Sequence, residues 1–203
     1  IGKDGPSQMG LEDIAMFRTL LDSVVLYPSD AVATERLVEI AAEHDGIVYL
    51  RLTRGKTPVI YQTTDDFRIG GSKTLRESDA DVCTVITAGY TLHETLAACD
   101  ILEQEGIHVR VIDLYSIKPL DKSALEKAAR DTGHLVVVED HFAEGGMGDA
   151  VFAALKGTPA TFSHLAVTKQ PGSGSTEDVL KAQGLDTDSI AHHIRQTARR
   201  KRG

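Results

Sequence analysis

Three short apolar strand patterns alternate with two helical patterns between residues 82 and 148, and this alternation most constrains the fold. The strands are predicted at residues 82–88, 109–114 and 135–138, where β-branched residues follow one another with little alternation. Such runs are typical of parallel strands that are covered on both faces. The order strand–helix–strand–helix–strand requires a parallel sheet with right-handed crossovers. The predicted fold class is therefore α/β.

Apolar residues at helical spacing predict the two helices of this unit. The first helix is expected to start near Thr91, which forms a capping box with Glu94, and to end before Gly106. The second helix is expected over residues 121–132. Each helix therefore forms a crossover between two strands of the sheet.

The residues before this unit predict a smaller unit of the same class. A glycine-rich loop, a short helix, a buried strand, a longer helix capped by Ser29 or Asp30, and another strand are expected in that order over residues 1–10, 11–17, 24–27, 30–44 and 47–52. Residues 57–81 are expected to form an extended linker with short strands. We expect the boundary between residues 72 and 80, with a first domain of residues 1–75 and a second domain of residues 76–203.

Residues 145–148 form a Gly-Gly-Met-Gly motif after the third strand of the central unit. A nucleotide-binding loop would need the Lys-Ser/Thr of a Walker motif or the G-x-G-x-x-G spacing, and both are missing. We expect the glycines to permit a tight turn into the next helix. The polar residues around them are expected to form an interface: Glu139, Asp140, His141 and Glu144. A helix, a strand and two more helices are predicted from residues 149, 162, 175 and 186 onward.

The composition argues against several function classes. The 203 residues carry a formal net charge of −8, and a nucleic-acid partner would require a basic face. No window of about 18 apolar residues predicts a membrane span. Eight scattered histidines without an H-x-x-x-H pair argue against a zinc site, and two cysteines fit a reducing cytoplasm better than a disulfide framework.

Arg54 is a candidate ligand-binding residue by its position alone. It follows the strand predicted at residues 47–52, and the ligands of open α/β sheets collect at the carboxyl ends of strands. An arginine there can bind a phosphate or a carboxylate through two parallel hydrogen bonds. The pattern leaves open that Arg54 is an ordinary surface arginine.

Motifs along nearly the whole chain resemble the transketolase family. The most specific is Gly-Lys-Asp-Gly-Pro-Ser-Gln-Met at residues 2–9, which Leu-Glu-Asp-Ile-Ala-Met-Phe-Arg follows at residues 11–18. The others lie in the family's order at residues 27–30, 51–54, 87–94, 117–121 and 138–141. The resemblance implies part of a pyrimidine-binding α/β/α domain, followed by a C-terminal α/β domain whose mostly parallel sheet is covered by helices.

The resemblance also implies an activity. Transketolases use thiamine diphosphate with Mg2+ or Ca2+ to move a two-carbon ketol unit from a ketose phosphate to an aldose phosphate in the pentose phosphate pathway. Asp4 resembles the family's aspartate that hydrogen-bonds a sugar hydroxyl, and Arg54 resembles the arginine that binds the sugar phosphate. Gln8 stands where the animal-type branch has a glutamine near the cofactor and the reacting oxygen, so it is the expected catalytic and cofactor-binding residue.

The rest of the family's active site is expected to lie before Ile1. The diphosphate and metal motif, the glutamate that activates the aminopyrimidine, and the aromatic residues around its ring are all N-terminal to this region in the family. No metal ligand is therefore expected in the chain. Because a cut inside a sheet exposes unpaired strand edges, we expect a fragment of a cytoplasmic homodimer that is inactive without its thiamine-diphosphate-binding part.

Two other interpretations remain open. The chain could be part of another thiamine enzyme, such as deoxyxylulose-phosphate synthase or the β subunit of a 2-oxoacid dehydrogenase, although the loop at residues 7–9 and Arg54 argue against both. It could also be a non-catalytic assembly or dimerisation module, in which residues 82–203 form an interface and contain no site of their own.

Overall fold

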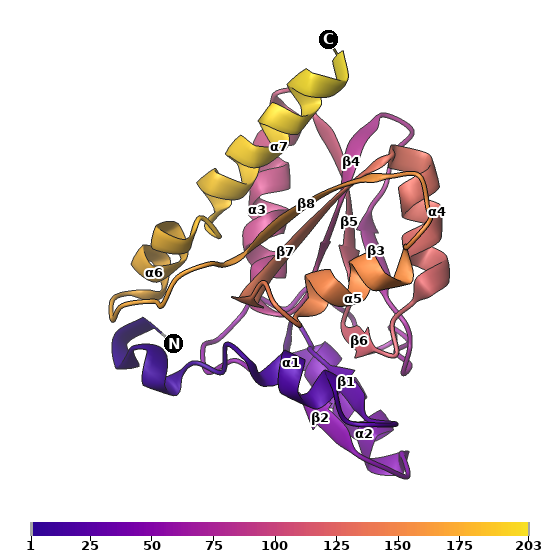
Figure 1. Ribbon diagram of the computed structural model, residues 1–203, viewed down its shortest axis with the longest axis vertical. Helices are drawn as coiled ribbons and strands as arrows, with labels where there is room; N and C mark the ends of the chain where they lie inside the picture. The colour runs from indigo at the N-terminus through magenta and orange to yellow at the C-terminus, as the bar shows by residue number, and fades with distance from the viewer. Residues whose placement is uncertain (1, 203) are drawn as a thin grey trace.

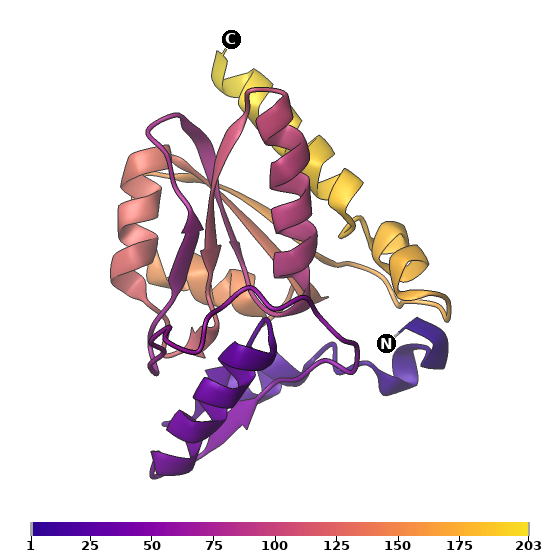
Figure 2. The same cartoon turned by 180° about the vertical axis from the view of Figure 1, so that it is seen from behind.

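The computed structural model describes residues 2–202 and contains a large and a small β-sheet (Figures 1 and 2). In the large sheet, with strand order β3-β5-β4-β7-β8, β3 is antiparallel to β5 and the other neighbours are parallel. Its strands are Lys73–Arg76 (β3), Asp81–Thr87 (β4), His108–Asp113 (β5), His134–Phe142 (β7) and Thr161–Val167 (β8). The prediction of a mostly parallel sheet is therefore confirmed.

Helices cover both faces of the large sheet. Helices α3 (Tyr90–Gln104) and α7 (Thr187–Arg202) pack on one face, whereas α4 (Lys122–Thr132) and α5 (Met147–Ala154) pack on the other. Figure 1 views the molecule from the side of α5, and Figure 2 from the side of α3. Residues of β4 and β7 are buried on both faces, which explains why their sequences lack strict alternation.

The small sheet lies beyond the carboxyl ends of the large sheet, at the bottom of Figure 1. Its strand order is β2-β1-β6, in which β1 (Val24–Leu26) and β2 (Val48–Leu50) are parallel and β6 (Ser116–Lys118) is antiparallel to β1. Helices α1 (Asp13–Arg18) and α2 (Ala31–Glu43) belong to this unit. Strand β6 was not predicted, because it has only three residues, two of them polar, and its partner is distant in the sequence.

The two units are joined by more than the connecting chain. Strand β3, which contains residue 75, forms an edge of the large sheet, while β6 completes the small one. The predicted N-terminal loop contains two short 3-10 helices, η1 (Gly2–Asp4) and η2 (Pro6–Gln8). Helix α6 (Thr176–Gln183) contacts η1, and the N–H of Gly174 donates to the carbonyl of Gly2 at 3.0 Å. The start of the chain therefore lies against its C-terminal part.

Several predicted helix starts are confirmed. The side chains of Asp30, Asp121 and Ser175 each accept a hydrogen bond from the backbone N–H three residues further on. Each cap satisfies an N–H group that has no partner inside its helix. Local sequence was sufficient here because the donor and the acceptor belong to the same turn.

The predicted capping box of α3 was wrong. Gly89 caps this helix with φ 59°, so Thr91 already lies inside it, and its buried hydroxyl donates to the carbonyl of Val138 at 3.2 Å. The Glu94 carboxylate instead accepts from the backbone N–H of Thr187 at 2.9 Å. Glycine adopts positive φ at no steric cost, so the chain turns into the helix before it reaches Thr91.

Candidate functional site

The candidate site lies where the carboxyl ends of β4 and β7 face the small sheet. The chain leaves β4 towards β5 and leaves β7 towards β8, on the opposite side of the sheet. A crevice forms where neighbouring connections diverge in this way, and open α/β sheets bind their ligands there. Tyr90 and Asp140 lie at these two strand ends.

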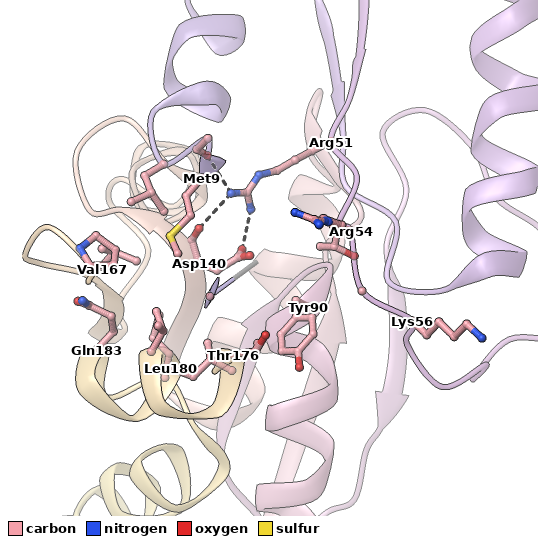
Figure 3. A pocket seen from close by; sticks show the side chains of 18 residues that line it. Met9, Arg51, Arg54, Lys56, Tyr90, Asp140, Val167, Thr176, Leu180 and Gln183 are labelled. Carbon is pink, nitrogen blue, oxygen red and sulfur yellow. Dashed lines mark hydrogen bonds and ion pairs between the residues drawn. The ribbon is translucent and has the colours of Figure 1, made fainter. Parts of the chain in front are cut away.

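A cavity of about 300 Å³ opens at this position (Figure 3). Its walls come from the N-terminal segment, from the loop after β2, and from the C-terminal region around α6. The residues that line it are Gly2, Met9, Gly10, Leu11, Arg51, Thr53, Arg54, Gly55, Lys56, Tyr90, Asp140, Val167, Pro171, Thr176, Val179, Leu180, Gln183 and Leu185. Apolar side chains form much of the wall, and the cations Arg54 and Lys56 are both exposed, so the cavity suits an anionic ligand.

Arg51 connects the walls of the cavity. Its Nε donates to Asp13 at 2.9 Å, and its Nη1 donates to the Asp140 carboxylate at 2.6 Å. Its Nη2 donates at 3.0 Å to the carbonyl oxygens of both Gly10 and Asp140. The guanidinium also lies over the ring of Tyr27, 4.6 Å from its centroid. One side chain therefore fastens α1, β7 and the end of the N-terminal loop to β2.

Burial and charge act against each other in this network. Burial lowers the pKa of Arg51, whereas the negative charges of Asp140 and Asp13 raise it, and the net pKa lies above the ordinary value of arginine. Burial also raises the pKa of Tyr27, and the neighbouring Asp140 raises it further. Tyr27 therefore stays neutral and donates its hydroxyl to Asp140 at 2.9 Å.

The structure brings together Asp4 and Arg54, two of the three expected site residues. Nη1 of Arg54 forms an ion pair with the Asp4 carboxylate, and the Arg54 side chain is 71% exposed. Gln8 is exposed at the end of η2 and lies on the same N-terminal loop as Asp4. Arg54 lines the cavity, whereas Asp4 and Gln8 do not.

Arg51, Tyr90 and Lys56 line the cavity and were not predicted as site residues. One feature of the sequence could have indicated Arg51: it is a charged residue at the end of an otherwise apolar strand pattern. A buried arginine requires carboxylate partners, but nothing in the sequence indicates which ones.

The glycine-rich turn after β7 is built around a buried carboxylate. Gly145 has φ 73°, which confirms the predicted tight turn. The Glu139 carboxylate accepts from the N–H groups of Met147 and Gly148 at 2.6 and 2.9 Å, and it pairs with Nε2 of His164 at 2.6 Å. A Cβ on Gly146 would overlap this carboxylate. The predicted interface role of Glu139 was therefore wrong, because its side chain is 3% exposed and caps α5.

His141 is also internal, which corrects its predicted interface role. Its ring is fully buried, Nδ1 donates to the carbonyl of Phe142 at 2.6 Å, and Nε2 accepts from the N–H of Ala15 at 3.3 Å. Asp140 does lie at an interface, but the interface is the one between the two units of this chain.

The described residues fit only a small part of a cofactor site. Among residues 2–200, no group of three or more histidine, cysteine, aspartate or glutamate side chains could hold a metal ion. The side chain of Gln8, the residue expected to contact a cofactor, is exposed. Within residues 2–202, no helix has both the length and the apolar character that crossing a membrane requires.

Fold and crevice together define an α/β protein with a cavity, lined in part by cationic side chains, at the carboxyl edge of a parallel sheet. The family models for the transketolase pyrimidine-binding domain and for the transketolase C-terminal domain match residues 1–59 and 72–190. The chain therefore belongs to the transketolase family. It is 49% identical to the transketolase of Homo sapiens over 197 residues, which are 96% of this chain and 32% of the human protein. The chain thus spans about a third of the length of such relatives.

Solved structures with the same fold agree with this assignment. A split gene transketolase, described as an inactive beta4 tetramer, superposes with a TM-score of 0.90 at 33% identity, over 96% of this chain and 64% of that chain. The transketolase of Campylobacter jejuni gives a TM-score of 0.78 at 20% identity, over 96% of this chain and 29% of that chain. The second likeness shows the fold alone.

Proposed function

We propose that this chain is the C-terminal part of a thiamine-diphosphate-dependent transketolase and that it supplies the residues that bind the sugar phosphates. One observation supports this most directly. Asp4 and Arg54 are 50 residues apart in the sequence, yet their side chains meet beside the cavity at the carboxyl edge. These are the two residues whose motifs resemble the family's substrate-binding residues.

The chemistry of these side chains suits the proposed roles. The guanidinium of Arg54 presents a fork of N–H donors that matches a phosphate, and the nearby Lys56 adds positive charge. The Asp4 carboxylate can accept a hydrogen bond from a sugar hydroxyl. The Gln8 amide can donate to the reacting oxygen or contact the cofactor. Thiamine diphosphate, when bound, supplies the carbanion and the electron sink of ketol transfer.

The remaining parts of the active site are proposed to come from elsewhere in a longer polypeptide. Within the described part of the chain, strand β2 has a partner on one side only, which leaves an edge where further strands can pair. Among the described residues, all but one of the exposed large apolar side chains lie within residues 16–59, and the exception is Phe162. The others are Met16, Leu20, Leu21, Val38, Ile47, Leu52 and Val59. This surface suits an N-terminal part that holds the diphosphate and its Mg2+ or Ca2+, in a homodimer located in the cytoplasm.

Replacing Arg54 by alanine in the complete enzyme tests the proposal. We expect the KM for xylulose 5-phosphate to rise by an amount equivalent to about 1.5 to 3 kcal/mol, because charge-assisted hydrogen bonds to the phosphate are lost. Arg130→Ala is a matched control, since Arg130 is also exposed and pairs with an acidic residue, Glu126, on the distant helix α4.

Other outcomes would favour the alternatives. An unchanged KM together with weaker dimers after Arg54→Ala would indicate an assembly module instead of a substrate site. Turnover of pyruvate, without transfer from xylulose 5-phosphate to ribose 5-phosphate, would indicate another thiamine enzyme. Either result would overturn the proposed function.

A further inference from the structure

The C-terminal domain contributes none of the expected substrate-site residues, yet its Asp140 reaches into the other unit to contact Arg51. We propose that Asp140 and Arg51 are positioning residues that hold the N-terminal loop and Arg54 in the geometry that binds sugar phosphate. This inference rests on the proposed function and gives the C-terminal domain a part in substrate binding.

The first step is the contact between Arg51 and the loop. Nη2 of Arg51 donates to the Gly10 carbonyl and to the Asp140 carbonyl, both at 3.0 Å, so the loop and strand β7 share one donor group (Figure 3). The neighbouring residue is fastened to the same strand, because the N–H of Phe142 donates to the Leu11 carbonyl at 3.0 Å. The loop end is therefore tied to β7.

The second step is the closure of a ring of contacts. From Gly10 the loop runs back to Asp4, whose carboxylate pairs with Arg54. Arg54 follows Arg51 by only three residues, at the same end of β2. The Arg51 side chain holds one end of the loop and the Arg54 side chain meets the other. A displacement of Arg51 therefore moves both sides of the substrate site together.

The contacts at position 51 require an arginine. Arg51 makes hydrogen bonds in three directions from a side chain that is 9% exposed. The planar guanidinium with five donors can do this, whereas a lysine carries a single compact ammonium group. Losing one of its two carboxylate partners would leave the buried charge only partly compensated, so the guanidinium would shift towards the remaining acceptors.

A second buried arginine provides a matched control. Arg110 on β5 is 7% exposed and pairs with Glu77, Asp81 and Asp131. Its network does not touch the N-terminal loop. Arg110→Lys should lower the free energy of unfolding for the same reason as Arg51→Lys, because buried ion pairs are lost. It should leave the geometry of the substrate site unchanged.

The test uses the complete polypeptide with Asp140→Asn, Arg51→Lys or Arg110→Lys, and it measures hydrogen exchange as well as kinetics. In the first two variants we expect amide exchange in residues 2–10 to accelerate by about tenfold, because the loop loses its anchor. The KM for the ketose phosphate should also rise by about tenfold, since small displacements of positioning groups have large kinetic effects. A ketol donor without a phosphate should be affected less.

The outcomes separate this inference from the proposed function. Unchanged exchange and unchanged KM in folded Asp140→Asn and Arg51→Lys would overturn the inference, as would equal changes in Arg110→Lys. If the unmodified protein shows no ketol transfer while the loop still loosens in both variants, the anchoring is supported and the proposed function fails. If Arg54→Ala raises KM but Asp140→Asn does not, the positioning role alone is refuted.

Discussion

At the scale of single residues, Gly89 shows how tightly the two units fit. Its φ of 59° is rarely adopted by other residues, and a Cβ at this position would overlap the ring of Tyr27 from the small sheet. The backbone N–H of Gly89 also donates to the Ser29 hydroxyl at 2.9 Å. The conformation of one residue therefore allows the small sheet to approach the large one.

We expect Gly89→Ala to lower the free energy of unfolding by about 3 kcal/mol, because steric overlap adds to backbone strain. Urea unfolding of the purified protein measures this change. Gly133→Ala is the control, since Gly133 also has positive φ but a Cβ there would meet nothing within 4 Å. Equal losses in both variants would mean that the contact with Tyr27 has no energetic weight.

A second residue-scale prediction concerns Asp113 at the end of β5. Its carboxylate is fully buried and accepts hydrogen bonds from Ser29 at 3.0 Å and from Tyr61 at 2.6 Å. Burial raises the pKa of Asp113 to about 7, although these hydrogen bonds lower it. The native state therefore holds this proton more tightly than the unfolded chain, whose aspartates have pKa values of about 3.9.

Because the pKa of Asp113 is higher in the folded state than in the unfolded state, its protonation stabilises the fold at low pH. The stabilisation from the protonated form is fully present below about pH 4 and is lost as the pH rises through about 7. We expect the stability of the wild-type protein to fall from pH 5 to pH 8 more steeply than that of Asp113→Asn. Thermal unfolding at both pH values measures the difference, and identical slopes would show that Asp113 is not protonated in this range.

At the scale of elements, Glu139 on β7 determines how α5 begins. Its carboxylate satisfies two backbone N–H groups at the start of this helix and also pairs with His164. We expect Glu139→Ala to destabilise the protein by about 2 kcal/mol, because these buried donors lose their acceptor. Faster hydrogen exchange at the Met147 and Gly148 amides would locate the effect. Unchanged exchange there would contradict the capping role.

The elements also show which features the sequence alone could predict. The parallel strands and the helix starts near Asp30, Asp121 and Ser175 depend on local patterns, so they were predicted correctly. The start of α3 at Gly89 was not predicted, because the backbone turns there with φ 59° and its N–H donates to Ser29 in the other unit. Strand β6 was missed for the same reason, since only its long-range pairing makes it a strand.

The candidate site was also only partly predictable from local sequence patterns. Family motifs were needed to connect Asp4 with Arg54, because no spacing rule predicts that residues 50 apart will meet. The carboxylate partners of Arg51 come from α1 and β7, so no local pattern could identify them.

At the scale of the whole molecule, the chain exposes surfaces that the proposed function assigns to contact with another part of the polypeptide. Its small sheet has an open edge at β2, and residues 16–59 carry most of the exposed large apolar side chains among the described residues. Cationic side chains line its crevice, and no group of three or more histidine, cysteine, aspartate or glutamate side chains among the described residues could hold a metal ion. Under the proposed function, substrate binding and cofactor binding are divided between this segment and the rest of a longer polypeptide.

The most direct test of this division is the rate of ketol transfer from xylulose 5-phosphate to ribose 5-phosphate, with thiamine diphosphate and Mg2+ present. The rate should be measured for the 203-residue chain alone and for the complete polypeptide that contains it. We predict transfer by the complete polypeptide and none by the chain alone. Sustained turnover by the isolated chain, or no transfer by the complete polypeptide, would contradict the account.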